Sequence, residues 1–78
     1  MGAVWIVRFI ENEDSASHTF YGSTKKWAIN QLKAFAETFS VDDQYDDASS
    51  SQMIQDLENG KMYVFNGGYA DIQFVNFI

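Results

Sequence analysis

The chain contains no cysteine, so disulfide bonds, thiolate catalysis and zinc sites that depend on sulfur are all excluded. Cationic residues are also few. There are 5 Lys and Arg against 11 Asp and Glu, which gives a formal net charge of -6 and a pI near 4.3. This acidity argues against direct binding of nucleic acid or of an anionic membrane.

Long hydrophobic runs are absent too. The apolar run from Ala3 to Ile10 is interrupted by Arg8 and is far too short to span a bilayer. The start of the chain lacks the basic residues and the small-residue cleavage site of a signal peptide. We therefore expect a cytoplasmic protein.

Aromatic residues are abundant: two Trp, four Tyr and seven Phe make up 17% of the 78 residues, and hydrophobic residues make up 46%. This is enough apolar material for a folded core and too much for a disordered acidic tail. The length corresponds to one domain, near the size at which a single core is marginal without disulfides, metal or association.

Hydrophobic patterning predicts two helices and four strands. The first helix begins after an N-cap at Ser23 or Thr24 and ends near Phe39 or Ser40, and the second runs from Gln52 to about Asn59 after a cap at Ser51. The predicted strands cover residues 3–10, 18–22, 61–65 and 69–78.

The order β-β-α-α-β-β predicts an α+β fold: one domain, 1–78, with a four-stranded antiparallel sheet and the helices on one face. Trp5, Val7 and Phe9 share one face of the first strand. We expect residues 66–68, Asn-Gly-Gly, to supply the positive φ angles of a tight hairpin between the last two strands.

Known catalytic and metal-binding patterns do not fit the chain. An EF-hand loop needs Gly at its sixth position and Glu at its twelfth, but a loop starting at Asp42 would have Asp47 and Met53 there. The segment is therefore not an EF-hand, and the alternative for its aspartates is a weak, non-standard cation site. His18 has Asp14, Ser15 and Ser17 nearby in sequence, but neighbours on an extended segment do not form a triad. We predict no enzyme activity, no metal and no cofactor.

Negative charge is concentrated in the middle of the chain. Residues 34–60 contain seven acids and no Lys or Arg, whereas the rest has four acids and five Lys or Arg. A patch of one sign attracts a basic surface and steers association. The alternative is that it only keeps the protein soluble. The predicted partner-binding residues are Glu37, Asp42, Asp43, Tyr45, Asp46, Asp47, Asp56 and Glu58, with Tyr45 as an aromatic anchor.

A second binding feature is surplus aromatic surface. The sheet face away from the helices would carry Tyr69, Val75 and Phe77, with Tyr21 or Tyr63 as further candidates. Tyrosine is enriched in binding patches. A homodimer interface and a two-sided core are the alternatives.

The small size, the acidity and the cluster Asp-Asp-Gln-Tyr-Asp-Asp at 42–47, without Pro, Cys or a catalytic motif, resemble small phage-encoded anti-defence proteins. These include anti-CRISPR proteins and anti-restriction DNA mimics. The resemblance lies in size, acidity and composition, and it aligns no functional residue.

The resemblance implies a non-enzymatic inhibitor in the cytoplasm of a bacterial host. Its carboxylates would occupy a basic, nucleic-acid-binding protein surface, as on a CRISPR effector or a nuclease, in place of DNA phosphates. Two other classes stay open: an immunity or antitoxin-like protein that neutralises a basic toxin, and a dimeric interaction module.

Overall fold

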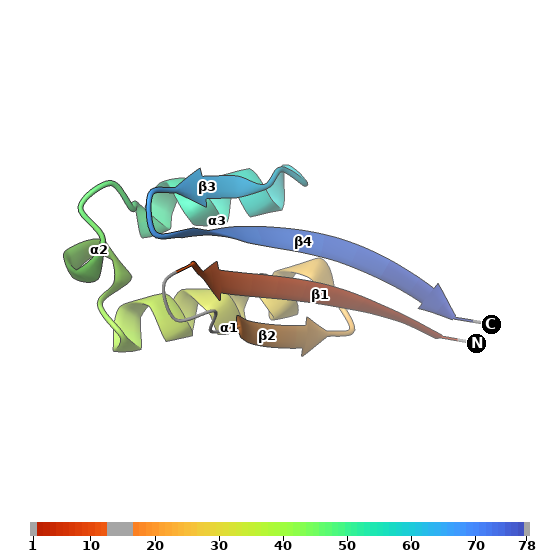
Figure 1. Cartoon of the computed structure of the whole chain (residues 1–78). Coiled ribbons are helices and arrows are strands. Elements are labelled where there is room, and N and C mark those ends of the chain that lie inside the picture. Colours follow the sequence, from red (N-terminus) through yellow and green to blue (C-terminus); the bar gives the residue numbers. More distant parts are fainter. Residues whose placement is uncertain (1, 13–16, 78) are drawn as a thin grey trace.

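The computed structural model of the chain (Figure 1) describes residues 2–12 and 17–77, and it confirms the predicted α+β fold. The elements in chain order are β1 (Gly2–Glu11), β2 (Ser17–Gly22), α1 (Lys25–Thr38), α2 (Val41–Gln44), α3 (Ser50–Glu58), β3 (Tyr63–Phe65) and β4 (Gly68–Phe77). The short helix α2 lies between the two predicted helices, in a segment for which the sequence predicts neither helix nor strand.

The four strands form one antiparallel sheet in the order β2-β1-β4-β3. The central strands β1 and β4 pair along their full length of ten residues each. The outer strands are shorter: β2 pairs only with Trp5 to Ile10 of β1, and β3 only with Gly68 to Ala70 of β4. The central strands therefore extend beyond the rest of the molecule, at the end opposite α2 (Figure 1).

The core lies between one face of this sheet and the helices α1 and α3. Phe9 of β1 is fully buried, and the rings of Phe35 and Phe65 lie 5.3 and 5.5 Å from its ring. Both helices bury an apolar side against the sheet: Leu32 of α1 and Leu57 of α3 are fully buried, whereas Phe39, which follows the apolar spacing of α1 in the sequence, is its C-cap and is 53% exposed. All buried strand side chains lie on this face; among the described residues, the outer face of the sheet has none.

Both longer helices begin at a hydroxyl N-cap. Thr24 Oγ1 accepts a hydrogen bond from the backbone N–H of Trp27 at 3.1 Å, as predicted. The cap predicted at Ser51 is wrong: Ser49 caps α3, and its Oγ accepts from the N–H of Gln52 at 3.3 Å. Three consecutive serines are equivalent as caps in sequence, so contacts from other segments decide which one is used.

The turn between β3 and β4 also differs from the prediction, because none of residues 66–68 has a positive φ. The glycines permit close approach instead. A Cβ atom on Gly68 would lie 1.9 Å from the carbonyl oxygen of Ile10, and one on Gly67 would lie 2.4 Å from the ring of Tyr45. Side-chain size, rather than φ, requires glycine here.

The outer face of the sheet contains some of the predicted surplus aromatics. Tyr21 is 59% exposed and pairs with Ile6 of β1 on this face. The suggestion that Tyr63 lies here is wrong, because its register opposite Ala70 directs its side chain toward the helices, where it is buried. The side chain of Phe77 lies outside the described residues.

Candidate functional site

The four aspartates Asp42, Asp43, Asp46 and Asp47 lie together at one end of the molecule, which we call the acidic end. They belong to α2 and to the turn that follows it, at the end of the sheet where β1 stops and β4 begins (Figure 1). All four are exposed. Within the described part of the chain, neither ion pair that forms involves any of them. No cation in the described ranges therefore forms an ion pair with them.

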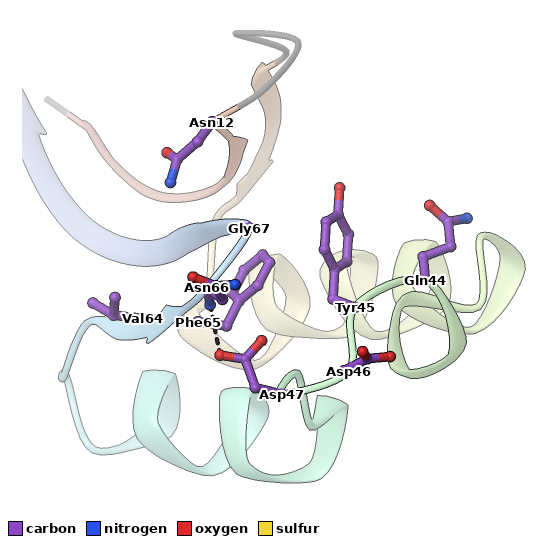
Figure 2. A pocket seen from close by; sticks show the side chains of 9 residues that line it. All are labelled: Asn12, Gln44, Tyr45, Asp46, Asp47, Val64, Phe65, Asn66 and Gly67. Atoms are coloured by element: carbon purple, nitrogen blue, oxygen red, sulfur yellow. Dashed lines mark hydrogen bonds between the residues drawn. The ribbon is translucent and has the colours of Figure 1, made fainter.

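Two of these carboxylates hold the local structure. Asp42 Oδ1 accepts hydrogen bonds from the N–H and the hydroxyl of Ser50, at 2.7 and 2.6 Å. This places a negative charge at the N-terminus of α3, where the helix dipole favours it. Asp47 Oδ2 accepts from the N–H of Asn66 at 2.7 Å, a bond drawn in Figure 2. These contacts connect the acidic end to α3 and to the β3–β4 turn.

The other two carboxylates are free to meet a partner. The side-chain carboxylates of Asp43 and Asp46 make no hydrogen bond or ion pair with any other residue that the structure describes, although the backbone N–H of Asp43 donates to the carbonyl of Ser40 at the start of α2. In Figure 2 the side chain of Asp46 points away from the β3–β4 turn. Because both residues are exposed and their carboxylates have no described partner, a cationic group could bind them without first breaking an internal contact.

Tyr45 lies in the sequence between Asp43 and Asp46, and its side chain is half-buried. Its ring lies edge-on to the ring of Phe65, with centroids 5.0 Å apart. Its hydroxyl donates a hydrogen bond to Glu11 Oε1 at 2.7 Å. Tyr45 therefore fixes the turn after α2 against the sheet, and only part of its ring remains available as the predicted anchor.

A shallow hollow of about 800 Å³ adjoins the acidic end (Figure 2). Its lining comes from three separate segments: Asn12; Gln44, Tyr45, Asp46 and Asp47; and Val64, Phe65, Asn66 and Gly67. Carboxylates, amides and aromatic carbon suit the long, cationic side chain of Arg or Lys. The sequence reasoning missed Asn12, Gln44 and Asn66, because nothing local marks three polar residues that only the fold brings together.

Of the other predicted acids, Glu37 lies near this end, beside Ser50, which donates to Asp42, whereas Asp56 and Glu58 lie further along α3. Glu37 lines a groove between α1 and α3 together with Lys33, and Glu58 lines a neighbouring groove with Lys25. Asp56 accepts a hydrogen bond from Gln52 Nε2 at 2.8 Å on α3. Glu58 ends α3, about 12 Å along the helix axis from its start beside the acidic end. Glu37 and Glu58 therefore belong to a flank of mixed charge, and Asp56 lies on α3 beside Gln52.

His18, the candidate base in the sequence, lies against an aromatic ring and near a carboxylate. The ring of His18 lies 4.5 Å from that of Phe35, and its Nε2 lies 3.9 Å from Glu11 Oε2. Asp14 and Ser15 lie outside the described residues. Within residues 2–12 and 17–77, no group of three or more His, Asp or Glu side chains is placed to hold a metal ion.

On the outer face of the sheet, Arg8 and Asp71 form an ion pair between the central strands. Arg8 Nε donates to Asp71 Oδ1 at 2.9 Å, and Nη2 donates to Oδ2. These hydrogen bonds, and then the charge of Asp71, raise the pKa of Arg8 above its ordinary value. The two opposite charges satisfy each other, so this face has little net charge at its centre.

The sequence matches no protein-family model, and no curated protein or solved structure is significantly similar to it. No helix in the described ranges is long and apolar enough to cross a membrane. Function has to be inferred from the surface of the chain itself.

Proposed function

We propose that this chain is a non-enzymatic inhibitor whose acidic end binds a cationic, nucleic-acid-binding surface of a bacterial defence complex, such as a CRISPR effector or a nuclease. The observation that carries the proposal is the acidic end itself: four exposed aspartates within residues 42–47, without an ion-pair partner among the described residues. The inhibitor would act in the cytoplasm of the bacterial host and would need no cofactor.

Electrostatics supports this reading. Duplex DNA presents about one negative charge per 1.7 Å of its axis, and proteins that bind it offer a matching density of Lys and Arg. Crowded carboxylates attract the same cationic groups, accelerate association and compete with phosphates for them. The mixed-charge flank around Glu37 and Glu58 would contribute much less, since nearby lysines oppose its acids.

The internal contacts support a preformed binding surface. Asp42, Asp47 and Tyr45 are fixed by hydrogen bonds to three other segments, so little conformational entropy is lost when the surface binds. We assign direct recognition to Asp43 and Asp46. The hollow that Asp46 lines would accept a cationic side chain of the partner, and its aromatic wall would prolong the complex.

Competition with DNA tests the proposal directly. The chain is added to a panel of purified CRISPR effector complexes and restriction nucleases with a fluorescent duplex, and DNA binding is followed by anisotropy. We expect inhibition of at least one complex that weakens as the duplex concentration rises and as salt is added. A complex that holds the chain and the duplex together, or a panel without inhibition, would contradict it. Neutralisation of a basic toxin alone would favour the immunity alternative.

A further inference from the structure

One edge of β4 has no neighbouring strand along most of its length. β3 pairs only with Gly68 to Ala70, so residues 71–77 have no described strand on that side (Figure 1). At 3.4 Å per residue, this free edge is about 20 Å long. In an antiparallel strand, one residue directs its N–H and C=O groups to one side and the next residue directs them to the other side. Every second residue of the free edge therefore presents an N–H and a C=O group without a partner strand.

The free edge lacks the features that keep exposed strands apart. Natural edge strands are commonly short, or carry Lys, other charges or Pro. Within the edge only Asp71 is charged, and its charge is paired with Arg8; residues 72–77, Ile-Gln-Phe-Val-Asn-Phe, contain none of these features, and the whole chain has no Pro. Residues 2–7 of the adjoining strand β1 are also uncharged. The edge is therefore open to pairing with another strand.

Apolar side chains flank the free edge on both faces of the sheet. On the helix side, Phe74 stays 51% exposed although its ring lies 4.7 Å from that of Trp5. On the outer side, Val75 lies opposite Val4 of β1. Strand pairing at this edge would bury part of this surface in addition to satisfying the backbone.

We propose that the free edge of β4 pairs antiparallel with the same edge of a second copy, joining two four-stranded sheets into one of eight strands. A two-fold axis perpendicular to the sheet would pass through the middle of the edge, near Phe74, and would keep the helices of both copies on one face. The contact is self-complementary, because any strand can pair antiparallel with its own copy.

The charge distribution permits a second copy as the occupant. The chain carries a net charge of -6, so two copies repel unless they meet through an uncharged region. The free edge provides one, and the acidic end lies at the opposite end of a molecule 42 Å long (Figure 1). The dimer would place its two acidic ends far apart and leave both exposed. The proposal of a dimer therefore does not depend on the proposed function.

The oligomeric state in solution is the first test. A contact of this size is small, so we expect a dimer that forms between about 10 and 200 µM. Sedimentation velocity over this range should show it, and added salt should strengthen it by screening the repulsion between copies. A monomer at every concentration would overturn the proposal and leave the edge to a strand of another protein.

Single cysteines then locate the contact, since the chain has none of its own. The variants Q73C, F74C and V75C are oxidised separately, with V64C on the exposed part of β3 as the control. Residues directly opposite in an antiparallel pair have Cα atoms about 4.5–5.5 Å apart, within disulfide range. We expect one of the three to cross-link rapidly and V64C to stay monomeric. Equal cross-linking of V64C would overturn the proposal.

A charge placed at the edge provides the complementary test. F74K would bring two ammonium groups together at the two-fold axis, so we expect it to weaken dimerisation at least about tenfold. V64K adds the same charge at an exposed residue of β3 and should leave the dimer intact. Circular dichroism confirms that both variants fold. A dimer that persists in folded F74K would overturn the assignment to this edge.

Discussion

The backbone of Gly67 lies so close to the ring of Tyr45 that a Cβ atom on this glycine would be 2.4 Å from two ring carbons. Tyr45 follows α2, whereas Gly67 belongs to the turn between β3 and β4. The hydroxyl of the same tyrosine reaches Glu11 at the end of β1. The acidic end is therefore attached to the sheet at this contact, and its position depends on the absence of a side chain at Gly67.

Substitution of the two neighbouring glycines should destabilise the fold to different degrees. In Gly67→Ala the ring of Tyr45 has to shift, which we expect to cost about 1–3 kcal/mol. In Gly68→Ala the clash is with the backbone carbonyl of Ile10, which cannot move as easily, so the loss should be larger. Urea denaturation measures both. Equal losses, or no loss in Gly67→Ala, would contradict this account.

The contact itself can be isolated by a double-mutant cycle. In a Tyr45→Ala background the ring is gone, so Gly67→Ala should cost less than it does in the natural chain. The same background should leave the cost of Gly68→Ala unchanged, because that clash does not involve Tyr45. An unchanged cost of Gly67→Ala would mean that the ring is not the obstacle.

Adjacent aspartates should differ in their contribution to stability. Asp42→Ala removes the acceptor of two hydrogen bonds from Ser50 at the start of α3, and we expect it to cost about 1 kcal/mol. Asp43→Ala removes an exposed carboxylate without an internal partner and should change the free energy of unfolding by less than about 0.5 kcal/mol. Thermal or urea unfolding distinguishes the two. Equal effects would show that Asp42 does not hold α3.

The Arg8–Asp71 ion pair should stabilise the sheet independently of pH near neutrality. Both side chains are partly exposed, so we expect Arg8→Met to cost about 0.5–1 kcal/mol. Folding raises the pKa of Arg8, so the stability that its charge contributes is fully present below the pKa that Arg8 has in the unfolded chain. This contribution is lost only in strong alkali. The difference from the natural chain should thus stay constant between about pH 6 and 9.

A lysine provides the control for this measurement. Lys61→Met removes the same charge at an exposed residue that forms no ion pair in the described part of the chain, and it should be nearly neutral. A loss in Arg8→Met no larger than in Lys61→Met would indicate that the pair contributes nothing measurable. A loss that varies strongly over this pH range would mean that another titrating group is involved.

The fold was predictable because its signals are local. The stripe that buries Leu32 and the cap at Thr24 both depend on residues within a few positions of each other, and the alternation of Trp5, Val7 and Phe9 assigns one face of a strand directly. A β-β-α-α-β-β order then leaves one simple antiparallel arrangement.

The details of the site were not predictable in this way. Asp47 accepts its hydrogen bond from Asn66, 19 residues further along the chain, and Gly67 is required by the ring of Tyr45 rather than by its own φ. Composition identified the acidic segment. It could not distinguish Asp42 and Asp47, whose carboxylates accept hydrogen bonds from other segments, from Asp43 and Asp46, whose carboxylates do not. It also grouped Glu37 and Glu58 with them, although the fold places those two beside lysines.

The central claim is that the acidic end, rather than acidity in general, binds a cationic partner. Two double variants with the same change in net charge test it: Asp43→Lys with Asp46→Lys, and Glu37→Lys with Glu58→Lys. All four residues are exposed. The measurement is the concentration of each variant that inhibits DNA binding by half in a susceptible complex. We predict at least about a tenfold loss of potency for the first variant and less than about threefold for the second. Equal losses in both, or full potency in the first, would contradict the account.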